Sequence, residues 1–229
     1  MFQKIIAFLL FSIFCWHSAV AQAPDYQFSP QVQKAKDQMQ LTLSTLFQFE
    51  QDDKNAKFDP VLKKLMLKND EKQITQYVDQ QKDVFIKHMN NQIRHGDATA
   101  TVALLEFALF FNDDELQEKI DLAPLQQLSD QKDAYASYLL AQQFKHTEDY
   151  IPLLEKAGQQ GFVLAQMTLA DEYGFRLPVE KQDEKKAAFW ANKAKQNLGE
   201  AAYTEQKCAL ANCDLEEFEM VDFSKLTQQ

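Results

Sequence analysis

Cysteine and histidine are the residues of this sequence with the most versatile chemistry, because they act as nucleophiles, metal ligands or disulfide partners. Cys208 and Cys213 stand five positions apart, which is not the Cys-x-x-Cys spacing of redox and zinc motifs, and no His lies near them. Five steps along an unbroken α-helix rise about 7.5 Å, which is too far for a disulfide. We therefore expect the helix to end near Ala211, where Asn212 tolerates a left-handed backbone, and Cys208 to bond Cys213 in a structural disulfide. A redox or metal pair is the alternative.

No catalytic motif accompanies these residues. His88 and His95 lie seven positions apart on one expected helix, with no acidic residue at metal-ligand spacing. The acidic run at residues 112–115 lacks the central Gly and alternating oxygen ligands of a calcium loop, and it is typical of a solvated helix start. The sequence also has no zinc-protease, nucleophile-elbow, Walker or dinucleotide-binding motif. We therefore expect no metal site, no cofactor and no enzyme activity, with a hydrolase as the weakest alternative.

The composition argues against several classes of partner and fold. The chain has 229 residues, with 24 Lys and Arg against 34 Asp and Glu, which gives a formal net charge of -10. Nucleic acid and anionic membrane surfaces bind clusters of basic side chains, so this balance argues against both as partners. Only 5 Gly and 6 Pro are present, too few for the turns of a many-stranded β fold.

The N-terminus carries the three-part layout of a secretory signal peptide. A short head with Lys4 is followed by twelve residues, ending at Trp16, that are nearly all apolar. Small residues come next, and Ala19 and Ala21 occupy the two positions that a signal peptidase reads. The apolar run is shorter than the roughly 20 residues that span a bilayer. We therefore expect cleavage after Ala21, removal of residues 1–21, and a periplasmic protein without membrane insertion.

Apolar residues recur at three- and four-residue steps along most of the chain, which predicts helices. This period covers residues 32–46 and residues 70–95, and between them Pro60 stands in the first turn of a short helix over residues 58–67. No stretch alternates apolar and polar residues for long enough to predict a strand. The fold class is therefore all-α, and residues 22–95 form an N-terminal helical segment that is either a cap or a separate unit.

A spacing repeats in the second part of the chain, residues 96–229. The series Ala-x3-Leu-Ala-x2-aromatic begins once at Ala136 and again at Ala165. The second copy continues in order through Gly174, Asp183, Ala187, Trp190, Lys193 and Ala194. This block resembles the Sel-like repeat, a longer relative of the tetratricopeptide repeat, and the resemblance is best over residues 132–199. It implies a right-handed solenoid of helical hairpins, in which each hairpin buries its apolar face against its neighbours.

The repeat alignment places two rows of residues on the inner surface that the first helices of successive hairpins would line. One row contains Val102, Tyr138 and Met167, and the other contains Glu106, Gln142 and Asp171. An aromatic and a Met beside acidic and amide groups make an adaptable protein-binding patch. The candidate partner-binding residues are therefore Glu106, Tyr138, Gln142, Met167 and Asp171. Alternatively, Tyr138 and Met167 form core between hairpins.

These features predict a periplasmic module that binds or assembles another envelope protein. Its acidic surface would favour a partner with a basic patch. The resemblance implies a sharper alternative, because some exported Sel-like repeat proteins are immunity proteins against lipase-type effectors of antibacterial secretion systems. An inhibitor of that kind would bind one toxin tightly, whereas a scaffold would bind more weakly and to several partners.

Overall fold

The computed structural model describes residues 26–48 and 57–211, and every regular element among them is a helix. The predicted all-α class is therefore confirmed for this part of the chain. The predicted signal peptide, residues 1–21, lies outside the described residues. The described residues form two units, residues 26–125 and residues 126–211. Among the described helices, none is both long and apolar enough to cross a membrane.

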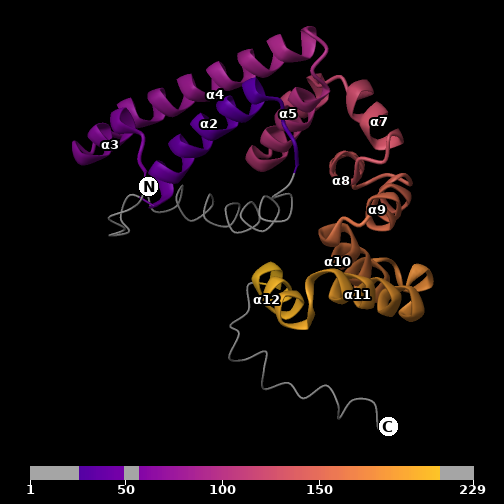
Figure 1. The fold of residues 1–229 in the computed structure, drawn as a ribbon. Helices are drawn as coiled ribbons and strands as arrows, with labels where there is room; N and C mark the ends of the chain where they lie inside the picture. Colours follow the sequence, from indigo (N-terminus) through magenta and orange to yellow (C-terminus); the bar gives the residue numbers. More distant parts are fainter. Residues whose placement is uncertain (1–25, 49–56, 212–229) are drawn as a thin grey trace. The chain divides into compact units, whose positions relative to one another are not determined.

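The first unit is built from helices among which α5 is the most deeply buried. Its elements are α2 (Pro30–Gln48), α3 (Pro60–Leu67), α4 (Glu71–Arg94), α5 (Ala98–Phe111), α6 (Asp114–Lys119) and the start of α7 (Ala123–Asp130). Helices α2 and α4 lie side by side, and α5 packs against both (Figure 1). Residues from Ala100 to Ala108 of α5 are buried without a break, as expected for a helix that is apolar on all sides and covered by its neighbours.

The boundary between the units lies further along the chain than the sequence pattern predicts. We expect from the sequence that the N-terminal segment ends at residue 95, but α5 packs on α2 and α4. Glu106 of α5 accepts a hydrogen bond from Lys36 of α2, and the backbone N–H of Ser29 donates to the Thr99 hydroxyl at 3.2 Å. Because α5 is fixed to α2 in this way, it belongs to the first unit, which ends at Leu125.

A buried carboxylate fixes the start of α3. Asp59 is only 1% exposed, and one of its oxygens accepts hydrogen bonds from the backbone N–H groups of Val61 (2.9 Å) and Leu62 (3.0 Å). The hydroxyls of Thr42 (3.2 Å) and Tyr77 (2.9 Å) donate to the other oxygen. Since Thr42 lies on α2 and Tyr77 on α4, this single side chain joins three helices.

Tyr77 makes this network sensitive to alkaline pH. Burial, together with the hydrogen bond to Asp59 and its charge, raises the pKa of Tyr77 from 10.0 to about 12. Between these pH values the folded state keeps the phenol proton and the unfolded chain releases it, so the stabilising contribution is lost as pH rises through this window. We expect the stability difference between wild type and Tyr77→Phe, about 1 kcal/mol near neutral pH, to shrink across the same window. Urea titrations at each pH measure it, and a constant difference would contradict the prediction.

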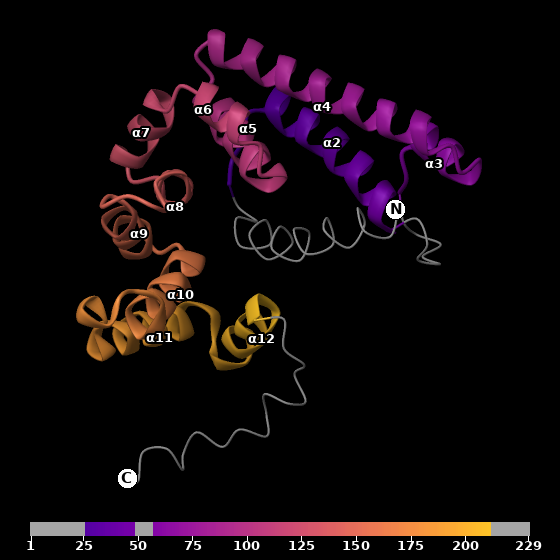
Figure 2. The ribbon, with the colours of Figure 1, turned by 180° about the vertical axis from the view of Figure 1, so that it is seen from behind.

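The second unit is a series of helices in which each packs against the next one along the chain (Figure 2). Its elements are α8 (Ala134–Gln143), α9 (Tyr150–Gln159), α10 (Val163–Asp171), the π-helical turn η1 (Glu172–Arg176), the 3-10 turn η2 (Val179–Lys181), α11 (Glu184–Leu198) and α12 (Glu200–Ala211). Residues 144–149 form the short connection between α8 and α9.

Helices α9, α10 and α11 approach closely at one glycine. A Cβ atom added to Gly158 of α9 would lie 2.9 Å from the ring of Trp190 on α11 and 3.1 Å from Leu169 on α10. The fully buried Gln166 of α10 connects the same three helices. Its amide nitrogen donates to the Gly158 carbonyl at 2.8 Å, and its amide oxygen accepts from Asn197 of α11 at 3.0 Å.

Candidate protein-binding surface

The first predicted row contains Val102, Tyr138 and Met167. Most of it is buried, although it was expected at a binding surface. Met167 is fully buried beside Tyr203 of α12, and Val102 is fully buried in the first unit. Tyr138 is half-buried, with its ring centre 4.9 Å from that of Phe162. Met167 is therefore a core residue, as the alternative interpretation had it. Helices α11 and α12 cover this side of α10. The repeat spacing alone therefore does not tell whether a row of residues is exposed on the inner surface or buried between helices.

The carboxylates of the second row are paired within the chain. Glu106, in the first unit, is 7% exposed and forms an ion pair with Lys36. Asp171, in the second unit, forms an ion pair with Lys207 of α12, and Gln142 of α8 is half-buried. Each of the two carboxylates thus has its charge balanced by a lysine of the same chain.

The remaining candidates for chemistry are the cysteine pair and groups of metal-ligating side chains. The side chain of Cys208 and the whole of Cys213 lie outside the described residues, so their disulfide stays a prediction. Within the described ranges, no three His, Cys, Asp or Glu side chains are grouped in a way that would hold a metal ion.

The turn η1 is anchored to its neighbours by two buried tyrosines. Glu172 is 7% exposed and accepts a hydrogen bond from the hydroxyl of Tyr150 on α9 at 3.2 Å. Burial and the neighbouring Glu172 raise the pKa of Tyr150, which keeps the hydroxyl protonated as a donor. The next residue, Tyr173, donates to Glu155 of α9 at 2.7 Å and accepts from Lys186 of α11 at 3.0 Å.

Backbone hydrogen bonds close the chain segment that follows these anchors. The N–H of Leu177 donates to the Glu172 carbonyl at 3.0 Å, the bond that defines the π-helical turn. The N–H of Asp183 donates to the Tyr173 carbonyl, also at 3.0 Å. Residues 174–182, which we call the apolar loop, are therefore held at both ends. Turns of this π-helical kind are frequent at functional sites.

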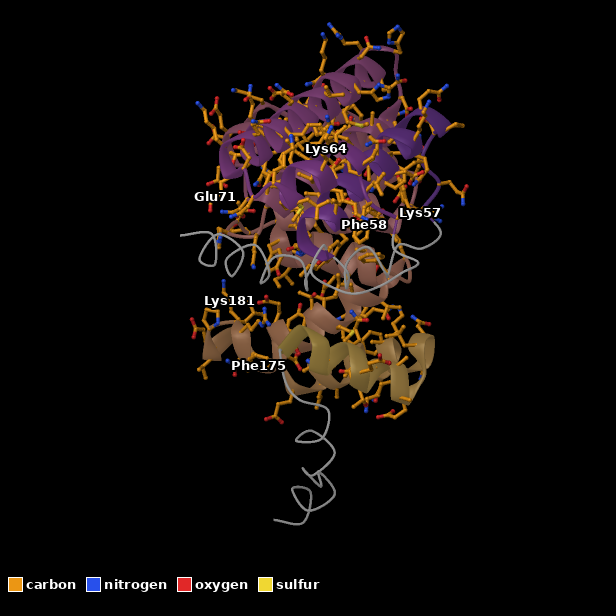
Figure 3. The ribbon with its side chains drawn as sticks, turned by 90° about the vertical axis from the view of Figure 1, so that its left-hand side faces the viewer. Lys57, Phe58, Lys64, Glu71, Phe175 and Lys181 are labelled. Atoms are coloured by element: carbon orange, nitrogen blue, oxygen red, sulfur yellow. The ribbon has the colours of Figure 1, made fainter. Side chains whose placement is uncertain are left out.

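The apolar loop exposes large apolar side chains. Six such side chains are exposed among the described residues, and Phe175 (64%) and Val179 (81%) are two of them. Figure 3 labels Phe175 together with Lys181, which is also exposed. The Arg176 guanidinium lies 5.8 Å from the Phe175 ring centre and 4.0 Å from Asp171. Phe and Arg are residue types enriched in protein interfaces.

The apolar loop was not predicted from the sequence, although its residues carry a signal. Between Gly174 and Asp183 the chain reads Phe-Arg-Leu-Pro-Val before it becomes polar. Connections between helices lie at the surface, and Pro178 disfavours a helix that would bury Phe175 and Val179 on one face. Exposed apolar residues in such a connection are a candidate contact with a partner.

Comparisons with protein-family models, curated proteins and solved structures give no match for this chain. The geometry of the described residues and the resemblance of residues 132–199 to the Sel-like repeat are therefore the grounds for a functional proposal.

Proposed function

We propose that this chain is an exported protein-interaction module, a Sel-like repeat solenoid that works in the periplasm and binds another envelope protein without catalysis. The observation that carries the proposal is the exposure of Phe175 and Val179 on a loop closed at both ends. A partner that docks on a fixed loop loses little free energy to ordering it. An aromatic side chain beside an Arg is a suitable centre for such a contact.

The packing of the second unit supports the solenoid part of the proposal. Each helix from α8 to α12 packs on the next one along the chain. Small residues lie where helices meet closely, such as Gly158 and the fully buried Ala165. A stack of hairpins in which contacts run between neighbours is the arrangement that repeat proteins use to display a binding surface.

The charge of the chain bears on the chemistry of the partner. The net charge is -10, so long-range attraction favours encounter with a protein that carries a basic patch. In the proposed complex the charge accelerates association, and the apolar loop supplies the contact that holds the partner.

The proposal predicts that removing two apolar side chains weakens partner capture. We expect Phe175→Ser combined with Val179→Ser to weaken binding by about tenfold or more, because truncation of a central contact residue typically has an effect of this size. Tagged wild-type and variant proteins are used to capture partners from an envelope extract after mild crosslinking, with quantification by mass spectrometry. Val84→Ser, which changes another exposed apolar residue (62%) in the first unit, is the matched control.

The outcomes separate the competing functions. A partner retained by wild type and Val84→Ser but lost from the double variant supports the apolar loop as the contact. One secreted toxin as that partner would favour the inhibitor, and several envelope proteins would favour the scaffold. Equal capture by all three proteins rules out the apolar loop as the site. The mass of the protein in the periplasmic fraction tests export, and we expect it to begin at Gln22.

A further inference from the structure

Helix α3 of the first unit presents an exposed face with two aliphatic side chains. The one residue of α3 that is buried is Leu62. Leu67 is 70% exposed and Val61 is 50% exposed, so neither contributes fully to the core of this unit. The apolar residues of α3 are thus divided between a buried side and a side that faces solvent.

Four lysines lie in the same segment of the chain as these exposed aliphatic residues. Residues 57–68 contain Lys57, Lys63, Lys64 and Lys68, and all four are exposed. The ion pairs formed among the described residues involve other side chains. Pro60, Lys63, Lys64 and Leu67 follow the spacing i, i+3, i+4, i+7, which places them on one side of a helix.

No exposed carboxylate interrupts this segment. Asp59 is the single acidic residue within residues 57–68. It is 1% exposed, and both of its oxygens accept hydrogen bonds inside the unit. The next carboxylate, Asp70, caps α4 by accepting from the backbone N–H of Gln73 at 3.1 Å. Figure 3 shows Lys57, Lys64 and the exposed Glu71 that follows at the start of α4.

We propose that α3 is a peripheral attachment site for anionic lipid headgroups. Lysine ammonium groups would contact headgroup phosphates, while Leu67 and Val61 enter the boundary between headgroups and acyl chains. The net charge of the whole chain argues against an anionic surface as a partner, but at physiological ionic strength charges further away than about 8 Å are largely screened. The local charge of α3 therefore decides the contact. This inference concerns the first unit and does not depend on the apolar loop.

The residue types on α3 favour a lipid surface over an acidic protein. Protein interfaces are enriched in aromatic residues, Met and Arg and depleted in Lys. Residues 57–68 contain no Tyr, Trp or Arg, Phe58 and Met66 are half-buried, and the exposed side chains include four lysines beside Val61 and Leu67. Long lysine side chains reach phosphate groups while their methylene stems remain against apolar surface, which suits the surface of a bilayer.

Vesicle co-sedimentation tests the proposal. The vesicles contain either phosphatidylcholine alone or equal parts of phosphatidylcholine and phosphatidylglycerol. We expect the wild-type chain to bind the anionic vesicles, and Lys63→Glu combined with Lys64→Glu to weaken that binding by about tenfold or more. Leu67→Ser should weaken it too, and added salt should release the wild type. All proteins carry the same N-terminal residues, so any contribution of residues 1–21 is shared.

A matched variant separates the local charge of α3 from the total charge of the chain. Lys87→Glu combined with Lys145→Glu changes the total charge by the same amount at two exposed lysines outside α3. We expect this control to bind like wild type. Equal weakening by both charge reversals, or equal binding of wild type to both kinds of vesicle, overturns the proposal. Failure to bind vesicles together with retention of an acidic protein would assign α3 to a protein partner instead. Circular dichroism verifies that each variant is folded.

Discussion

Replacing Trp190 with Ala is expected to lower the free energy of unfolding of the second unit by about 3–5 kcal/mol. Trp190 is 3% exposed and lies where α9, α10 and α11 meet. Removal of the indole leaves a cavity that the surrounding helices cannot fill without moving. Urea denaturation followed by circular dichroism measures the loss, because the variant lacks the tryptophan that would otherwise report on this unit.

The same site allows a sharper test with a small substitution. A Cβ at position 158 would lie 2.9 Å from the Trp190 ring, so Gly158→Ala should destabilise wild type by about 1–2 kcal/mol despite the better helix propensity of Ala. In the Trp190→Ala background only the approach to Leu169, at 3.1 Å, remains, so the added methyl should cost clearly less than in wild type. Additive effects of the two substitutions would contradict this contact. Gly174→Ala is the control, since its Cβ would meet only Ala187, at 3.8 Å, and should be nearly neutral.

The second large effect is expected at Asp59. Asp59→Ala removes the acceptor for two backbone N–H groups and two hydroxyls. Loss of a helix cap costs about 1 kcal/mol, and buried donors left without an acceptor add about 1–3 kcal/mol. We therefore expect a loss of about 3 kcal/mol in the unfolding free energy of the first unit, measured by urea denaturation with circular dichroism.

A second cap on the neighbouring helix provides the comparison. Asp70 caps α4 and accepts from the backbone N–H and the side-chain amide of Gln73 at 3.1 and 2.6 Å, but this cap is exposed. Asp70→Ala should therefore cost only about 1 kcal/mol. Equal losses for the two variants would show that burial of the Asp59 network adds nothing. Asp59→Asn, which keeps one oxygen as an acceptor, should recover part of the stability.

The helices and their ends were largely predictable from local sequence. The period of apolar residues predicts helices over residues 58–67 and 70–95, and the structure has α3 at Pro60–Leu67 and α4 at Glu71–Arg94. Pro60 fits the first turn of α3, and Asp59 and Asp70 cap the two helices as short polar side chains do. These features depend on residues that are close in the chain, which is why sequence alone indicates them.

The features that depend on distant residues were not predictable in the same way. The pair formed by Lys36 and Glu106 joins positions 70 residues apart, and it helps to place α5 in the first unit. Met167 follows the spacing of an exposed row, but α11 and α12 cover it. The turn η1 depends on the anchor between Tyr150 and Glu172, which no local pattern reports. The apolar loop that follows it was therefore also missed.

The order of packing in the second unit has a consequence for how it reaches its folded state. Because each helix packs on the next, from α8 and α9 through to α12, many of its contacts join positions close in sequence. Forming such contacts costs the chain little conformational entropy, so a unit in which they dominate folds fast. Under the proposed export, α8 and α9 can pair before α11 has left the translocation channel. We therefore expect the unit to assemble from its N-terminal end, with α12 as the last helix to dock.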